Sequence, residues 1–106
     1  MIKPITPSEA RAKVEANIPD FVIEAFNNKI VQSIDSRNYA KVLQNSVISE
    51  IMYCANERNI EVSREEIFAK GWLNVERLFR DTGWTVLYDK PGYNESYEAY
   101  FEFSSK

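Results

Sequence analysis

Histidine is absent from this sequence of 106 residues. Because histidine is the commonest general base near neutral pH and the commonest zinc ligand, its absence excludes Ser-His-Asp and Cys-His catalytic arrangements within one chain. With only 3 glycines, the sequence also has no Gly-rich phosphate loop, and no spacing typical of a metal site occurs. The sequence therefore predicts a protein that is not an enzyme and has no catalytic residues, cofactor or metal ligands.

Cysteine occurs once, and long apolar runs are missing. Cys54 lies between apolar positions of a helical pattern, where an unpaired thiol usually behaves as a small buried hydrophobic group. No stretch approaches the roughly 18 apolar residues of a membrane-spanning helix, and the N-terminal sequence lacks the apolar centre of a signal peptide. We therefore expect a location in a reducing cytoplasm.

Acidic residues outnumber basic ones: the sequence has 13 Lys and Arg residues and 16 Asp and Glu residues, which gives a net charge of −3. Such a balance repels polyanions at long range, which disfavours broad binding of nucleic acid or acidic membranes. A hydrophobic content of 44% supports a core without disulfides. The length fits a single domain over residues 1–106.

Capping residues and helical spacing predict four to five helices before residue 83. Thr6 and Glu9 form a capping box, and Ser63 and Glu66 form a second one. Pro19 begins a helix whose apolar residues recur at helical spacing. The predicted helices span residues 6–16, 19–34, 36–58, 63–69 and 72–81.

From Trp84 onward the apolar pattern has a period of two, which predicts a β-strand. After a turn-rich segment at 90–96, a second strand is expected from Tyr97 to Phe103, with Tyr97 facing inward and Tyr100 outward. An isolated hairpin is marginal in water, so its apolar face is expected to pack on the helices or on a second subunit. The predicted fold class is α+β, with a helical part at 6–82 packed on an antiparallel hairpin at 84–103.

Tyrosine and tryptophan gather in and around this predicted hairpin. Most of these rings can be explained as cover for the core, but Tyr93 in the turn and Tyr100 on the outward face cannot. Because such rings bury large areas at low entropic cost, they favour interfaces. The candidate interaction surface consists of Trp84, Tyr88, Tyr93, Tyr97, Tyr100, Arg77 and Arg80. The expected partner is a protein, either further copies of this chain in a homo-oligomer or a separate component.

Three alternatives stay open from the residues alone. The helix pair at 64–81 followed by the hairpin has the order of a winged helix, but its bases are balanced by acids and Lys90 stands alone in an acidic hairpin, so nucleic acid is the less favoured partner. A small ligand or nucleotide could bind between Trp84, Tyr88 and Arg77 or Arg80. The hairpin carboxylates could supply an acid and a base, although solvent-facing strand positions produce the same residues. These carboxylates are Asp89, Glu95, Glu98 and Glu102.

Three segments, Ile18–Ala25, Gly71–Glu76 and Gly83–Tyr97, carry a family likeness that spans most of the chain. In them the sequence resembles a family of short proteins encoded by tailed bacteriophages, and the last segment is the most distinctive. The resemblance implies a phage origin and action in the cytoplasm of a bacterial host or in the virion. It implies no activity and transfers no site residue. Combined with the residue pattern, it predicts a phage accessory protein of the host-takeover or anti-defence type, or alternatively a virion structural component.

Overall fold

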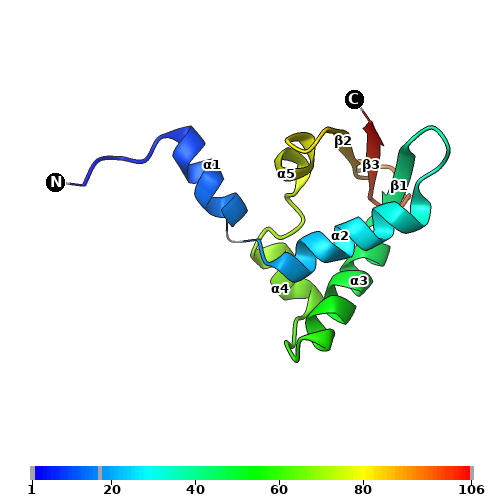
Figure 1. Ribbon diagram of the computed structural model, residues 1–106, viewed down its shortest axis with the longest axis horizontal. Helices are drawn as coiled ribbons and strands as arrows, with labels where there is room; N and C mark the ends of the chain where they lie inside the picture. Colours follow the sequence, from blue (N-terminus) through cyan, green and yellow to red (C-terminus); the bar gives the residue numbers. More distant parts are fainter. Residues whose placement is uncertain (1, 17, 106) are drawn as a thin grey trace.

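The computed structural model describes residues 2–16 and 18–105, and within them it has five helices and one three-stranded sheet. The elements in chain order are α1 (Pro7–Ala16), α2 (Asp20–Ser33), β1 (Tyr39–Leu43), α3 (Gln44–Glu57), α4 (Arg64–Ala69), α5 (Glu76–Arg80), β2 (Trp84–Asp89) and β3 (Tyr100–Ser105). The strands pair antiparallel in the order β1-β3-β2. The predicted α+β class is confirmed, and β2 and β3 are the two arms of the expected hairpin (Figure 1).

The two predicted N-terminal caps are present. The hydroxyl of Thr6 accepts a hydrogen bond from the amide of Glu9 at 3.2 Å and donates one to the Glu9 carboxylate at 2.9 Å. The hydroxyl of Ser63 accepts from the amide of Glu66 at 3.1 Å. Each cap satisfies an amide that the first helical turn would leave without a partner, which fixes where α1 and α4 begin.

A strand occupies a segment for which the sequence predicts a helix. Residues 39–43 form β1, which pairs with β3 so that Ala40 lies opposite Phe103 and Val42 opposite Phe101. The prediction of one helix over 36–58 is therefore wrong in its first part, and α3 begins at Gln44. Asn38, just before β1, has a φ of 58°, a left-handed conformation that does not continue a helix. A short apolar run is compatible with both the helical period of 3.6 and the strand period of 2, and here pairing with β3 favours the strand.

The helix predicted over 72–81 is shorter than expected, because only α5 at Glu76–Arg80 is helical. Trp72 and Leu73 are both buried, and the Trp72 ring packs edge-on against Phe21 with centroids 5.4 Å apart. Both residues lie in the turn that follows Gly71, from which their side chains reach the core. Gly71 itself has a φ of 67°, which glycine adopts without a steric cost.

The second arm of the hairpin begins three residues later than predicted, at Tyr100 instead of Tyr97. Pairing with β2 ends where Asp89 faces Tyr100. The carbonyl of Ala99 accepts a hydrogen bond of 2.9 Å from the amide of Gln44 and so joins the start of α3. Residues 90–99 form the loop between β2 and β3, and the predicted inward strand position of Tyr97 is wrong.

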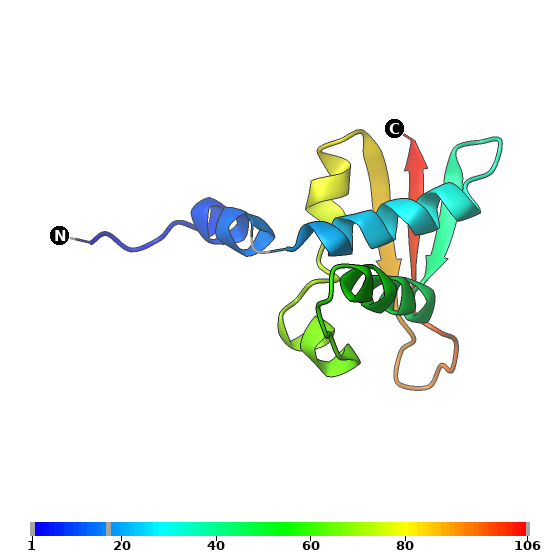
Figure 2. The same ribbon diagram turned by 60° about the horizontal axis from the view of Figure 1, so that its bottom comes forward.

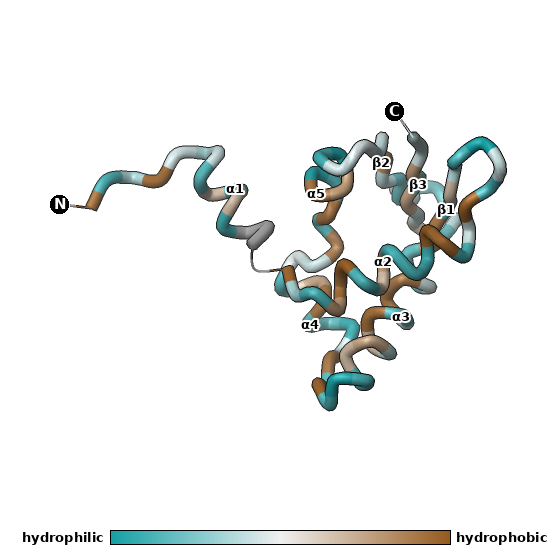
Figure 3. Tube along the Cα trace, viewed as in Figure 1, coloured by the Kyte–Doolittle hydropathy of each residue, from teal (hydrophilic) through white to brown (hydrophobic). Residues whose placement is uncertain are grey.

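The core lies between the sheet and helices α2, α3 and α5 (Figure 2). Phe26 of α2 is at its centre, with the rings of Phe79, Phe101 and Phe103 at centroid distances of 6.0, 5.1 and 6.2 Å. Apolar residues concentrate on the segments of α2, α3 and the sheet that face one another (Figure 3). Cys54 is buried among them, as predicted.

The backbone of helix α1 stands apart from the packed elements (Figures 1 and 2), although Arg11 of this helix lines a surface pocket with residues of α5. Its side chains from Pro7 to Lys13 are exposed, except for the partly buried Ala10. Among the described residues, no helix is both long enough and apolar enough to cross a membrane.

Replacing Trp84 with alanine is expected to lower the free energy of unfolding by about 1–3 kcal/mol. The indole packs edge-on against Phe103 with centroids 6.3 Å apart but is only half-buried, so the loss should be smaller than the roughly 3–5 kcal/mol of a fully buried tryptophan. Urea denaturation followed by far-UV circular dichroism measures it, with Thr85→Ala at the exposed neighbouring position as the control. An unchanged midpoint in Trp84→Ala would contradict the packing on Phe103.

Candidate functional site

One face of the sheet is covered by no described helix. Helices α2, α3 and α5 lie on the opposite face, and side chains alternate between the two faces along each strand (Figures 1 and 2). The strand register places the uncovered side chains in three rows, and none of them is buried. The rows are Tyr39, Ser104 and Thr85; Lys41, Glu102 and Leu87; and Leu43, Tyr100 and Asp89. We call these residues the outer face.

Tyrosine hydroxyls on and beside the outer face donate hydrogen bonds to carboxylates. Tyr39 donates to Glu102 at 2.8 Å, and Tyr100 donates to Asp89 at 3.1 Å. Tyr97 reaches in from the 90–99 loop to the other oxygen of Asp89 at 2.6 Å, and its ring lies 6.1 Å from that of Tyr100. Asp89 therefore ties the loop to the end of the sheet.

These hydrogen bonds raise the pKa values of the phenols. The bond to Asp89 raises the pKa of Tyr97 to about 12, and the same carboxylate raises the pKa of Tyr100. Glu102 raises the pKa of Tyr39 in the same way. A phenol is already protonated near neutral pH, so these shifts affect the protein only in alkaline solution.

The Tyr97–Asp89 bond predicts a distinct step in an alkaline titration. The pKa of Tyr97 is raised from 10.0 to about 12, so the stability contributed by this bond is complete below pH 10 and is lost as the pH rises towards 12. The difference between the tyrosinate absorbance titrations of wild type and Tyr97→Phe should be one phenol with a midpoint near 12. A difference titrating at the ordinary 10.0 would contradict the bond.

The four hairpin carboxylates considered as acid and base are all engaged in local contacts. Asp89 and Glu102 accept from tyrosines, as described above. Glu95 accepts a hydrogen bond from the amide of Gly92 at 2.8 Å, and Glu98 accepts one from the amide of Asn45 at 3.3 Å. In the part of the chain that the structure describes, no three His, Cys, Asp or Glu side chains are grouped to hold a metal ion.

The structure divides the predicted aromatic surface residues between two faces of the sheet. Tyr97 and Tyr100 lie at the outer face, and Tyr93 is fully exposed in the 90–99 loop. Tyr88 and Trp84 lie on the helix-covered side, where the Tyr88 ring packs against Phe101 with centroids 4.8 Å apart. Tyr97 and Tyr100 therefore share one surface, and Trp84 and Tyr88 lie on the other side of the sheet.

The two arginines of the predicted interaction surface lie neither on the outer face nor in the pocket that Tyr88 lines. Arg77 and Arg80 line a surface pocket of about 200 Å³ together with Arg11, Asn74 and Glu76. Arg80 also donates a hydrogen bond of 2.9 Å to the carbonyl of Val86, which lies on the edge strand β2. Tyr88 lines a different pocket, so the structure does not gather these side chains in the arrangement that a nucleotide between them would require.

Sequence reasoning missed the contribution of β1 to the outer face. Tyr39, Lys41 and Leu43 were assigned to a helix, although their alternation with buried Ala40 and Val42 is the signal of a strand. Lys41 places its ammonium 4.3 Å from the centre of the Tyr100 ring, which adds a cation–π contact to the face.

In comparisons with protein-family models, curated proteins and solved structures, nothing matches this chain.

Proposed function

We propose that this chain is a non-enzymatic protein-binding module whose contact surface is the outer face together with the 90–99 loop. The observation that carries the proposal is a sheet face without a covering helix on which hydrogen-bonded tyrosines stand beside exposed leucines. Leu43, Leu87 and Tyr93 are 40%, 58% and 102% exposed. Aromatic rings held in place by hydrogen bonds lose little side-chain entropy on binding, which favours such residues at interfaces.

The charges of this surface indicate the chemistry of the partner. Asp89, Glu95, Glu98 and Glu102 outnumber the cations Lys41 and Lys90. Electrostatic complementarity sets the rate and specificity of association, so the partner is expected to present a basic rim around an apolar centre. A second copy of this chain, with a net charge of −3, is a poorer match.

The resemblance to tailed-phage proteins supports the setting in which this module works. We assign it to the cytoplasm of an infected bacterium, as an accessory protein that binds a host or phage protein in the manner of host-takeover or anti-defence factors. A virion component is the alternative, and mass spectrometry of purified phage particles distinguishes the two. Copies of the chain in the particles would favour the structural role.

The proposal is tested by affinity capture from a lysate of infected bacteria, comparing wild type with Tyr100→Ala and with Tyr53→Ala. Tyr53 lies on α3 and is 59% exposed, so it controls for the loss of an exposed tyrosine away from the outer face. The partner should be retained by Tyr53→Ala and depleted by Tyr100→Ala, with both variants folded by circular dichroism. A monomer that captures no partner, or equal capture by both variants, would overturn the assignment.

A second candidate, DNA binding, is favoured by the topology. The run α2, β1, α3, α4, α5, β2 and β3, with the sheet order β1-β3-β2, follows the arrangement of winged-helix domains, in which the loop between the last two strands is the wing. The charges count against it. Lys70 is paired with Glu66 at 2.7 Å and Arg80 is bonded to Val86, while the 90–99 loop carries Glu95 and Glu98.

Fluorescence anisotropy with a labelled DNA duplex at low salt separates the two candidates. Phosphate contacts release counterions, so true DNA binding would weaken steeply with salt. We expect no saturable binding. Saturable binding with that salt dependence would make DNA the preferred partner.

A further inference from the structure

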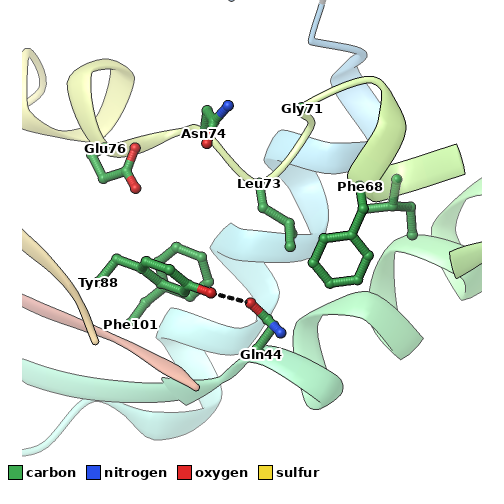
Figure 4. A pocket seen from close by; sticks show the side chains of 9 residues that line it. Gln44, Phe68, Gly71, Leu73, Asn74, Glu76, Tyr88 and Phe101 are labelled. Atoms are coloured by element: carbon green, nitrogen blue, oxygen red, sulfur yellow. Dashed lines mark hydrogen bonds between the residues drawn. The ribbon is translucent and has the colours of Figure 1, made fainter. Parts of the chain in front are cut away.

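A pocket with a cavity volume of about 140 Å³ lies on the helix-covered side of the sheet, where α3, α4 and the 71–76 segment meet β2 (Figure 4). Its wall has an apolar part that includes Ile67, Leu73 and Phe101. Its polar groups are the side chains of Gln44, Asn74, Glu76 and Tyr88. The outer face lies on the other side of the same sheet, so the two surfaces are separate.

The polar groups of this pocket carry one sign of charge. Glu76 is the only charged residue among the described residues that line it, and its carboxylate points into the space beside Tyr88 (Figure 4). Burial raises the pKa of Tyr88, and the negative charge of Glu76 raises it further. The Tyr88 hydroxyl donates to the side-chain oxygen of Gln44, so that pair holds the rim in place.

Glu76 also borders a second pocket that Arg11, Arg77 and Arg80 line, but none of these arginines lines the pocket at Tyr88. Arg64 donates to the side chain of Asn45 at 2.8 Å and lies against the Phe68 ring, and Lys70 is paired with Glu66. Among the described residues Glu76 makes no salt bridge, whereas Glu24, Glu50 and Glu66 each make one. A carboxylate beside a concave apolar wall is complementary to a cation attached to a short apolar stem.

From this arrangement we infer that the pocket binds a short alkylammonium group, with the ammonium at Glu76 and Tyr88 and the alkyl stem against Leu73 and Phe101. The size agrees, because an apolar cavity of roughly 150 Å³ holds a molecule of benzene dimensions. The group can come from a free small amine or from the lysine side chain of a peptide. Phosphate-bearing ligands are disfavoured here, since none of the described residues that line the pocket is basic.

Nuclear magnetic resonance titration of the full chain tests this inference with n-butylammonium as the probe and butyrate as its anion of matched size. Saturable shifts are expected for the side-chain amides of Gln44 and Asn74 and the backbone amides of 71–76, with n-butylammonium only. Glu76→Gln keeps the shape and removes the charge, so it should weaken binding about 10- to 100-fold. Glu65→Gln, an exposed position of α4 outside the pocket, is the matched control and should bind like wild type.

A titration with the peptide acetyl-Gly-Lys-Gly-amide distinguishes the two sources. Binding of both probes identifies a lysine of a partner as an occupant, and binding of n-butylammonium alone identifies a free amine. Absence of shifts, equal shifts with butyrate, or unchanged binding in Glu76→Gln would overturn the inference. None of these outcomes bears on the protein-binding proposal, whose variant Tyr100→Ala lies on the other side of the sheet.

Discussion

Replacing Phe26 with alanine is expected to lower the free energy of unfolding by about 3–5 kcal/mol. Its ring is 0% exposed and contacts three further phenylalanine rings, one from α5 and two from β3. Removing it leaves a cavity between a helix and the sheet, and the surrounding rings cannot all move to fill that cavity because each is held by its own element. The loss is a large part of the roughly 5–15 kcal/mol by which native domains are stable.

The measurement is urea denaturation of the purified chain followed by far-UV circular dichroism. Val31→Ala provides the control, because Val31 is on the same helix and is 74% exposed. The control should differ from wild type by less than about 0.5 kcal/mol. A Phe26→Ala variant as stable as that control would mean that α2 does not pack on the sheet through this ring.

Local signals in the sequence predicted the parts of the fold that local interactions determine. The caps at Thr6 and Ser63 and the restart at Pro19 depend on neighbours within four residues, and all three appear where they were expected. The strand β2 is likewise predicted by the alternation of apolar and polar residues within its own sequence. These elements needed no knowledge of a distant partner.

The strand β1 could not be predicted in the same way, because its conformation depends on a partner some 60 residues away in the sequence, β3. Taken alone, residues 39–43 also fit the apolar spacing of the helix that follows them, and the helix pattern is the longer one. The same dependence explains the start of β3, since the hydrogen bond between Gln44 and Ala99 is set by where β1 ends.

For the candidate surfaces, too, local features of the sequence were informative, whereas features that depend on tertiary packing were not. Their places in the predicted hairpin pointed to Tyr93 and Tyr100, because an aromatic residue in a turn or on the outward strand face has no place in the core. Tyr97 was included with them as a hairpin aromatic, although it was predicted to face inward. The pocket at Glu76 was not foreseen, since Gln44, Asn74, Glu76 and Tyr88 come from α3, a turn, α5 and β2. No spacing within a single element brings these four side chains together. Their convergence follows only from the packing of the elements.

Replacing Ala40 with aspartate tests whether β1 packs one face against the core, and we expect a loss of about 3 kcal/mol or more. In the structure Ala40 is 0% exposed and faces the core opposite Phe103. Burial would raise the pKa of the introduced carboxyl, so the loss relative to wild type should shrink as the pH falls below that pKa and the group becomes neutral.

Lys41→Ala is the matched control for that substitution, because Lys41 is the next residue and its side chain lies on the outer face. It should cost no more than a few tenths of a kcal/mol, since it removes an exposed charge and one cation–π contact. Urea denaturation of both variants at neutral and acidic pH gives the comparison. If Ala40→Asp were as stable as Lys41→Ala at neutral pH, residues 39–43 would not be a strand with one buried face, and the outer face would lose the row that β1 supplies.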